Sequence, residues 1–219
     1  MRFALDTLQE QQFKQQKWIA VQGLFKDTDI LSLKEILTSH MVDPSKKGSH
    51  IDFLTQFKAS RDLWRIDERL KSIVSRTRIL SLIAELVQER PLRLALDQAL
   101  ILSQGQEESK YFKHPLSLNQ FTSIQGLVAG LLICIEPGEY LVDPLPQEPG
   151  ECTIVHPDLT LPMDALEESK KGLYYLISYA SKNAVYRLGT HDPIKNYLRD
   201  FEYTQGDLLS NRSHPIVYL

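Results

Sequence analysis

The chain has 219 residues, of which 42% are hydrophobic and 24% charged, and its formal net charge is −3. This length can bury the core of one domain, expected to span residues 1–219. The small negative net charge gives no electrostatic case for nucleic acid binding, which requires a concentrated basic face. The longest apolar run, residues 126–135, is about half as long as a membrane-spanning helix, and the N-terminus is too polar for a signal peptide. We therefore expect a cytoplasmic protein without a nucleic acid or membrane partner.

Residues 1–90 are expected to form a mainly helical front with one early strand. The glutamine-rich residues 9–17 predict a short surface helix, and the apolar residues 18–21 (WIAV) predict the strand. Acidic and hydroxyl side chains at residues 27–29 can cap a further helix. The apolar face of that helix carries Ile30, Leu33 and Leu37.

Apolar residues then recur at intervals of three and four from Ile66 to Val87, with one gap at Thr77. This spacing predicts a single amphipathic helix over residues 66–88, which ends before Pro91. Acidic residues accompany a series of arginines on or beside this helix, which favours a solvated, salt-bridged face. The arginines are Arg61, Arg65, Arg69, Arg76, Arg78, Arg90 and Arg93.

Residues 91–219 are expected to form a β-rich barrel. Residues 92–102 could be strand or helix, and residues 121–135 predict one or two buried strands. Short strands are also predicted at residues 152–155, 173–180, 184–188 and 216–219, and a brief helix at residues 192–199. The predicted fold class is α+β: a helical N-terminal half packed on a jelly-roll or cupin-like barrel.

Histidine and aspartate two residues apart can bind iron together with a distant second histidine. The chain contains this spacing at residues 50–52 and 156–158. With six histidines, chance readily produces it, and Pro157 bends the second pair into a turn. No metal site is therefore favoured; the alternative set of ligands is His114, His156, Asp158 and His214.

Other catalytic motifs are absent from the sequence, which has no P-loop, no GxSxG, no GxGxxG and no CxxC. Cys134 and Cys152 both lie in apolar runs, so we expect buried free thiols. Arg93 could form part of a carboxylate or phosphate site, because a planar guanidinium suits bidentate binding of such anions.

Three segments together resemble the phytanoyl-CoA dioxygenase family of iron- and 2-oxoglutarate-dependent oxygenases. They are FKQQKWIAVQGLFKDTDILSLKEIL near the N-terminus, PLRLALDQAL with its Asp97-Gln98 pair, and GECTIVHPDLTLPMDALEESKKGLYYLISYA. The resemblance implies a double-stranded β-helix. It also puts Leu161 or its neighbours where the distal iron ligand belongs, and Lys170 or Lys171 where the co-substrate's cation belongs.

The strand that should carry the first two iron ligands falls between residues 102 and 121, where only the segment His114-Pro115-Leu116 is found. The resemblance therefore implies an oxygenase-like frame without iron-dependent catalysis, acting as a ligand-binding or scaffolding module with no cofactor. Its partner would be a small molecule or a protein. The candidate ligand-binding residues are Arg93, Asp97, Gln98, Lys171 and Arg187.

Two alternatives remain open from the sequence. The first is a working Fe(II)/2-oxoglutarate-dependent hydroxylase, in which Lys171 or Arg187 anchors the co-substrate. The second is a protein-interaction subunit that docks through the helix at residues 66–88 or through the glutamine-rich N-terminus.

Overall fold

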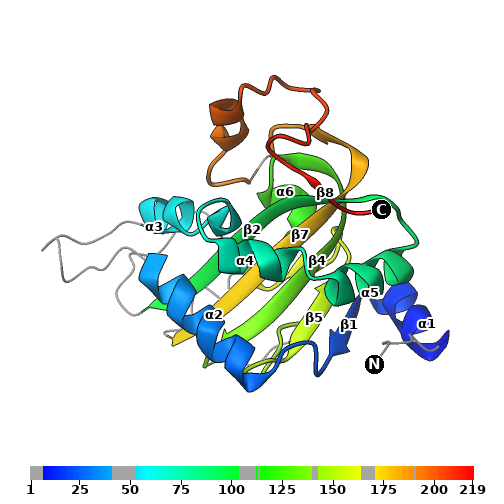
Figure 1. Ribbon diagram of the computed structural model, residues 1–219, viewed down its shortest axis with the longest axis vertical. Helices are drawn as coiled ribbons and strands as arrows, with labels where there is room; N and C mark the ends of the chain where they lie inside the picture. The colour runs from blue at the N-terminus through cyan, green and yellow to red at the C-terminus, as the bar shows by residue number, and fades with distance from the viewer. Residues whose placement is uncertain are drawn as a thin grey trace, which may run out of the picture.

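The computed structural model describes residues 7–40, 53–103, 112, 114–139, 143–163, 171–189 and 191–219. They form helices and a large antiparallel sheet with the strand order β1-β5-β4-β7-β2-β8, which curls into a half-barrel (Figure 1). This agrees with the predicted mixture of helix and barrel-like sheet. The strands are β1 (Trp18–Val21), β5 (Cys152–Val155), β4 (Ile124–Glu136), β7 (Lys171–Tyr186), β2 (Leu92–Ser103) and β8 (Ile216–Tyr218).

A second, two-stranded sheet pairs β3 (Leu116–Ser117) with β6 (Thr160–Leu161). In its antiparallel register Leu116 lies opposite Leu161, and Ser117 lies opposite Thr160. The short helix α6 (Leu118–Phe121) follows β3 directly and leads into β4.

Helices cover one face of the large sheet (Figure 1). Buried Leu33, Leu70 and Ile83 of this layer share a core with Ile133 and Tyr179 of the sheet. Besides α6, the helices among the described residues are α1 (Thr7–Gln16), α2 (Asp27–His40), α3 (Phe53–Ala59), α4 (Glu68–Val74) and α5 (Thr77–Val87), with 3-10 turns η2 (Leu63–Arg65) and η3 (Tyr197–Phe201).

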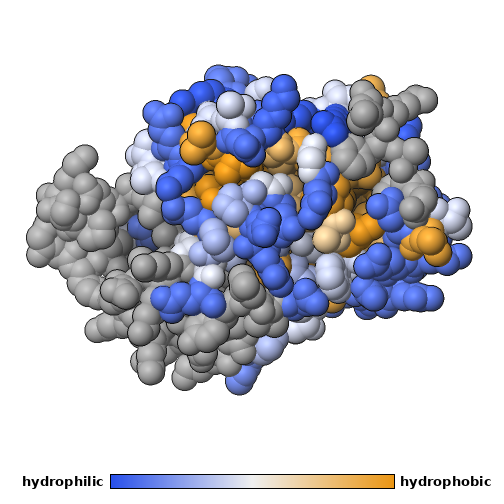
Figure 2. Space-filling view, turned by 90° about the horizontal axis from the view of Figure 1, so that it is seen from below, coloured by the Kyte–Doolittle hydropathy of each residue, from blue (hydrophilic) through white to orange (hydrophobic). Residues whose placement is uncertain are grey.

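The opposite face of the sheet carries a second core, which includes Phe121, Leu132 and Tyr174. Side chains alternate along a strand, so Tyr174 and its neighbour Tyr175 enter different cores. Figure 2 shows one face of the molecule from below, where hydrophobic residues gather in the middle and hydrophilic residues frame them.

The prediction of one helix over residues 66–88 was wrong, because the chain leaves the helix at Ser75 and Arg76. Arg76 takes an extended backbone, and its Nη1 lies 3.2 Å from Oδ2 of Asp29 in α2. Most of the apolar stripe faces the core, since Leu70 and Leu80 are buried, whereas Ile66 at its start is 70% exposed.

Several strands form as the local pattern predicted, and two are longer. β1 and β5 have the predicted bounds, and residues 92–102 are strand rather than helix. β7 is one continuous strand where two were expected, and the late helix begins at Tyr197 rather than at Asp192. Cys134 and Cys152 are buried and unpaired, as predicted. Among the described residues, no helix has both the length and the apolar character needed to cross a bilayer.

Candidate functional site

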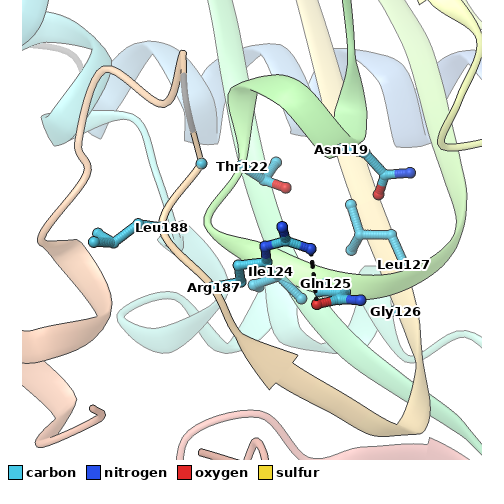
Figure 3. A pocket seen from close by; sticks show the side chains of 9 residues that line it. Asn119, Thr122, Ile124, Gln125, Gly126, Leu127, Arg187 and Leu188 are labelled. Atoms are coloured by element: carbon cyan, nitrogen blue, oxygen red, sulfur yellow. Dashed lines mark hydrogen bonds between the residues drawn. The ribbon is translucent and has the colours of Figure 1, made fainter. Parts of the chain in front are cut away.

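A hollow of about 390 Å³ opens at one end of the sheet, between α6, the start of β4 and the end of β7 (Figure 3). Its wall combines amide, hydroxyl, guanidinium and apolar groups. The lining residues are Asn119, Thr122, Ile124, Gln125, Gly126, Leu127, Arg187, Leu188 and Gly189.

Local sequence explains how this wall is built. Ser117 and Gln120 form a capping box that starts α6, with Ser117 N donating to Gln120 Oε1 at 2.9 Å. α6 places Asn119 beside the hollow, and its Nδ2 donates to Asp158 Oδ1 at 2.6 Å. Gly126 has φ +97° at a register shift of β4, and a Cβ there would lie 3.0 Å from Ala184 Cα. The irregular strand therefore requires glycine at this point.

Arg187 is the cation of the hollow. Its backbone N donates to Ser123 O at 3.0 Å, which fixes the chain just beyond β7. Its Nη1 donates to Gln125 Oε1 at 3.4 Å (Figure 3). The structure gives this exposed guanidinium no carboxylate partner among the described residues. It therefore keeps donors that suit a carboxylate-bearing ligand.

Asp97, another predicted ligand-binding residue, is fully buried and serves the fold. Its Oδ2 accepts hydrogen bonds from Trp64 N at 3.0 Å and from the Tyr175 hydroxyl. Burial, and then the nearby charge of Asp62, raise the pKa of Asp97 to about 7. These contacts attach the η2 turn to the sheet.

Gln98 makes the neighbouring attachment. Its Nε2 donates to Ser60 Oγ at 2.8 Å and to Phe57 O at 3.1 Å, and its Oε1 accepts from Arg61 Nε at 3.0 Å. The Asp97-Gln98 pair thus connects residues 57–64 to the outer edge of β2 and does not line the hollow of Arg187.

Arg93 holds the C-terminal segment instead of an open anion site. This buried guanidinium donates through Nη1 to Asn211 Oδ1 at 2.9 Å and to His214 O. The solvated face predicted for the arginines is therefore wrong for Arg93, and also for Arg61, which is 6% exposed. Lys171 begins β7, but its side chain lies outside the described residues.

The alternative metal ligands lie in different parts of the molecule. His156 borders a separate hollow beside Phe13 and Lys17, and its Nδ1 accepts from Asp158 N at 3.2 Å in the turn that the sequence predicted. His214 is fully buried near the C-terminus, and His114 is exposed. Among the described residues, no three His, Cys, Asp or Glu side chains gather to hold a metal ion. The pair at residues 50–52 lies outside the described residues.

No family model matches the chain, and no curated protein matches it. Solved structures do match. A non-heme alpha ketoglutarate dependent carbocyclase, SnoK from nogalamycin biosynthesis, has a TM-score of 0.69 and 12% identity over 96% of both chains. The epimerase SnoN from the same biosynthesis has a TM-score of 0.67 and 13% identity over 97% of this chain and 98% of its own. CytC3 with Fe(II) and alpha-ketoglutarate has a TM-score of 0.61 and 14% identity over 87% of this chain and 82% of its own. The chain shares their fold.

The fold that the chain shares with these structures makes the pairing of β3 with β6 informative. The sequence resemblance placed the first iron ligands between residues 102 and 121 and the distal ligand at Leu161 or its neighbours. The two places meet in the register that sets Leu116 opposite Leu161. Both leucines are buried, at 4% and 1% exposed, within the second core. A hydrocarbon side chain offers iron no donor, so neither Leu116 nor Leu161 can ligate that metal.

Asn119, Thr122 and Gln125 were missed by the sequence analysis, because single amide and hydroxyl residues form no motif. The one available signal was Gly126 in an otherwise apolar run, which is typical of a bulge or a close backbone approach.

Proposed function

We propose that this chain is a ligand-binding module on a double-stranded β-helix frame similar to that of the phytanoyl-CoA dioxygenase family, without iron-dependent catalysis. Its ligand would be a small carboxylate-bearing molecule held at Arg187. The observation that carries the proposal is the β3–β6 register, in which Leu116 faces Leu161 where the resemblance expects iron ligands. The buried free thiols of Cys134 and Cys152 support a reducing compartment such as the cytoplasm.

Iron retention needs several nitrogen and oxygen donors around one point, usually two histidines and a carboxylate. One imidazole alone cannot hold Fe(II) against water and competing sites. His156 and His214 border separate hollows, which supports a frame that has lost this chemistry.

The hollow of Arg187 supports the binding half of the proposal. Its volume of about 390 Å³ suits a small metabolite. Arg187 supplies charge and paired donors, while Asn119 and Gln125 add neutral donors and acceptors that can orient the rest of a ligand.

The test is a thermal-shift series on purified protein under anaerobic conditions. Fe(II) with 2-oxoglutarate is compared with a panel of mono- and dicarboxylates added without metal. We expect a metal-independent shift with one class of carboxylate. Arg187→Gln should remove that shift, whereas the matched control Arg199→Gln, which changes an exposed arginine outside the hollow, should keep it.

Metal analysis separates this proposal from the hydroxylase alternative. Stoichiometric, tightly bound iron together with a 2-oxoglutarate shift that needs Fe(II) would contradict the proposal. A carboxylate shift that is equal in wild type and Arg187→Gln would reject the assignment of the hollow.

A further inference from the structure

A small chamber lies beside the hollow of Arg187. It is formed where the residues just before η2 meet the C-terminal segment, and Arg61, Asp62, Asp192 and His214 all line it. Ile124, the first residue of β4, lines both the chamber and the hollow, so the two spaces are neighbours. The space open to the centre of a water molecule in the chamber is about 10 Å³. This is roughly the smallest space that can hold one water.

The charges around the chamber are largely compensated. Arg61 Nη1 lies 3.2 Å from Asp192 Oδ1, and Asp192 Oδ2 accepts from Ser123 Oγ at 2.6 Å. On the other side, Asp62 Oδ2 accepts from Arg65 Nε at 2.9 Å and from Tyr197 OH at 3.0 Å. Both oxygens of Asp192 thus have partners, whereas Arg61 and Asp62 each keep one polar atom outside these contacts.

Three lining residues each keep one buried polar atom without a hydrogen-bond partner among the described residues. The atoms are Arg61 Nη2, Asp62 Oδ1 and His214 Nε2. Their residues are 6%, 4% and 0% exposed, so bulk water does not reach them. Burying a polar group without a hydrogen-bond partner is unfavourable, so a bound partner for these atoms is favoured.

We propose that the chamber binds one water molecule, which accepts a hydrogen bond from Arg61 Nη2, donates to Asp62 Oδ1 and bonds to His214 Nε2. Three partners are typical of a buried structural water. The donors and acceptors also decide against an ion. An anion would face the carboxylates of Asp62 and Asp192, whereas a cation would face the Arg61 guanidinium. A neutral molecule that both donates and accepts fits all three atoms.

The bound water would connect three parts of the chain that are distant in sequence. Arg61 and Asp62 belong to the segment that covers the edge of β2, since Arg61 bridges to Gln98. His214 belongs to the C-terminal segment, which Arg93 also holds. Because Ser123 joins Asp192 and also accepts from Arg187 N, the hydrated chamber supports the back wall of the hollow.

A high-resolution crystal structure of the full chain tests the site directly. We expect one density peak within about 2.7 to 3.2 Å of the three orphaned atoms. A dry chamber, in which Arg61 and Asp62 turn to bond each other, would overturn the proposal. So would density for a larger ligand or an ion.

Oxygen-17 relaxation dispersion, which counts long-lived internal waters in solution, gives an independent test. Ala95→Val adds two methyl groups at the chamber wall and should remove one such water from the count. Ala99→Val makes the same change on the same strand but in the other core, and should leave the count unchanged. Equal counts in the two variants would contradict the proposal.

Discussion

Asp97 is a buried carboxyl whose folded-state pKa of about 7 exceeds its ordinary value of 3.8. Between these two values the folded chain binds the proton more tightly than the unfolded chain does. The contribution of Asp97 to the free energy of unfolding therefore decreases as pH rises from about 4 to 7, by an amount on the order of a few kcal/mol. Asp97→Asn should remove this decrease. Urea unfolding of both proteins across that pH range measures this effect, as the free energy of unfolding of the wild type minus that of the variant.

His214 and Asp67 also have shifted pKa values, and their effects on the free energy of unfolding differ from that of Asp97. Burial, then Arg65 and Arg93, lower the pKa of His214 to about 3, so His214 adds stability as pH rises and partly masks Asp97 in the wild-type curve. The hydrogen bond from Arg69 lowers the pKa of Asp67, and its effect lies below pH 4. Asp67→Asn should thus run parallel to wild type between pH 4 and 7. A flat wild-type minus Asp97→Asn difference would contradict the expectation.

The two thiols offer a second prediction for single residues. Burial, then Glu151 and Glu136, raise the pKa of Cys134 to about 12, and burial also raises the pKa of Cys152 well above its usual range. The thiolate is the reactive form, so neither thiol should react with a disulfide reagent at pH 8. Both should react once the chain is unfolded in urea, which serves as the control. Fast labelling of one thiol in the native protein would show that its strand opens locally.

Single residues also show where the sequence is least informative. Asp192 pairs with Arg61 across 131 positions, and Asn211 bonds to Arg93 across 118 positions. A local pattern of arginines and acids cannot reveal such partners, so the sequence favoured a solvated face for both arginines. Arg187 was identified from the sequence as a candidate anchor for a carboxylate, and it does line a hollow. The amides opposite it carried no comparable signal.

Among the elements, the C-terminal segment depends on one side chain. Arg93 donates to Asn211 and to His214 O, and its Nη2 lies 3.5 Å from Lys182 O. Arg93→Gln should lose charge-assisted hydrogen bonds worth roughly 1.5–3 kcal/mol. We expect faster amide hydrogen exchange in residues 203–215 and in β8, with little change in β4.

Arg90→Gln is the matched control for this prediction. Arg90 is exposed, and its guanidinium lies over the Tyr218 ring of β8 at 5.2 Å from the centroid. Its loss removes the same charge near the same element without breaking a buried contact, so exchange in residues 203–215 should stay close to wild type. Equal acceleration in both variants would show that overall charge, rather than the Arg93 contacts, holds the segment.

An element was easier to predict from the sequence when it was longer and when its bounds did not depend on contacts with distant residues. β1 and β5 were predicted at their observed bounds, because short apolar runs flanked by polar turns are local signals. β3 and β6 have two residues each and follow no period, so their pairing emerges only from the fold. The helix over residues 66–88 was interrupted for a similar reason, since Arg76 reaches across to Asp29. The hollow combines residues from α6, β4 and the segment after β7, so its lining depends on the fold and only Arg187 was found in advance.

At the scale of the whole molecule, two cores share one sheet. β4 and β7 send alternate side chains into the helix-side core and into the opposite core, so neither core can lose its sheet without disrupting the other. The two tryptophans report on them separately: Trp64 is buried in the helix-side core, and Trp18 packs against the opposite one. If residues 1–219 form a single domain, as the sequence predicts, the two cores should therefore unfold in one cooperative transition.

Trp18→Phe and Trp64→Phe leave one fluorescent reporter in each core. Within either variant, we expect the fluorescence midpoint in urea to coincide with the midpoint from far-ultraviolet circular dichroism, because unfolding of a shared sheet is a single transition. The midpoint itself can differ between the two variants, since each substitution changes a different contact. The comparison is therefore made between probes and not between variants. Trp18 fluorescence could instead change at lower urea than circular dichroism, while Trp64 fluorescence follows circular dichroism. The core opposite the helices would then unfold independently, and the chain would behave as two folding units.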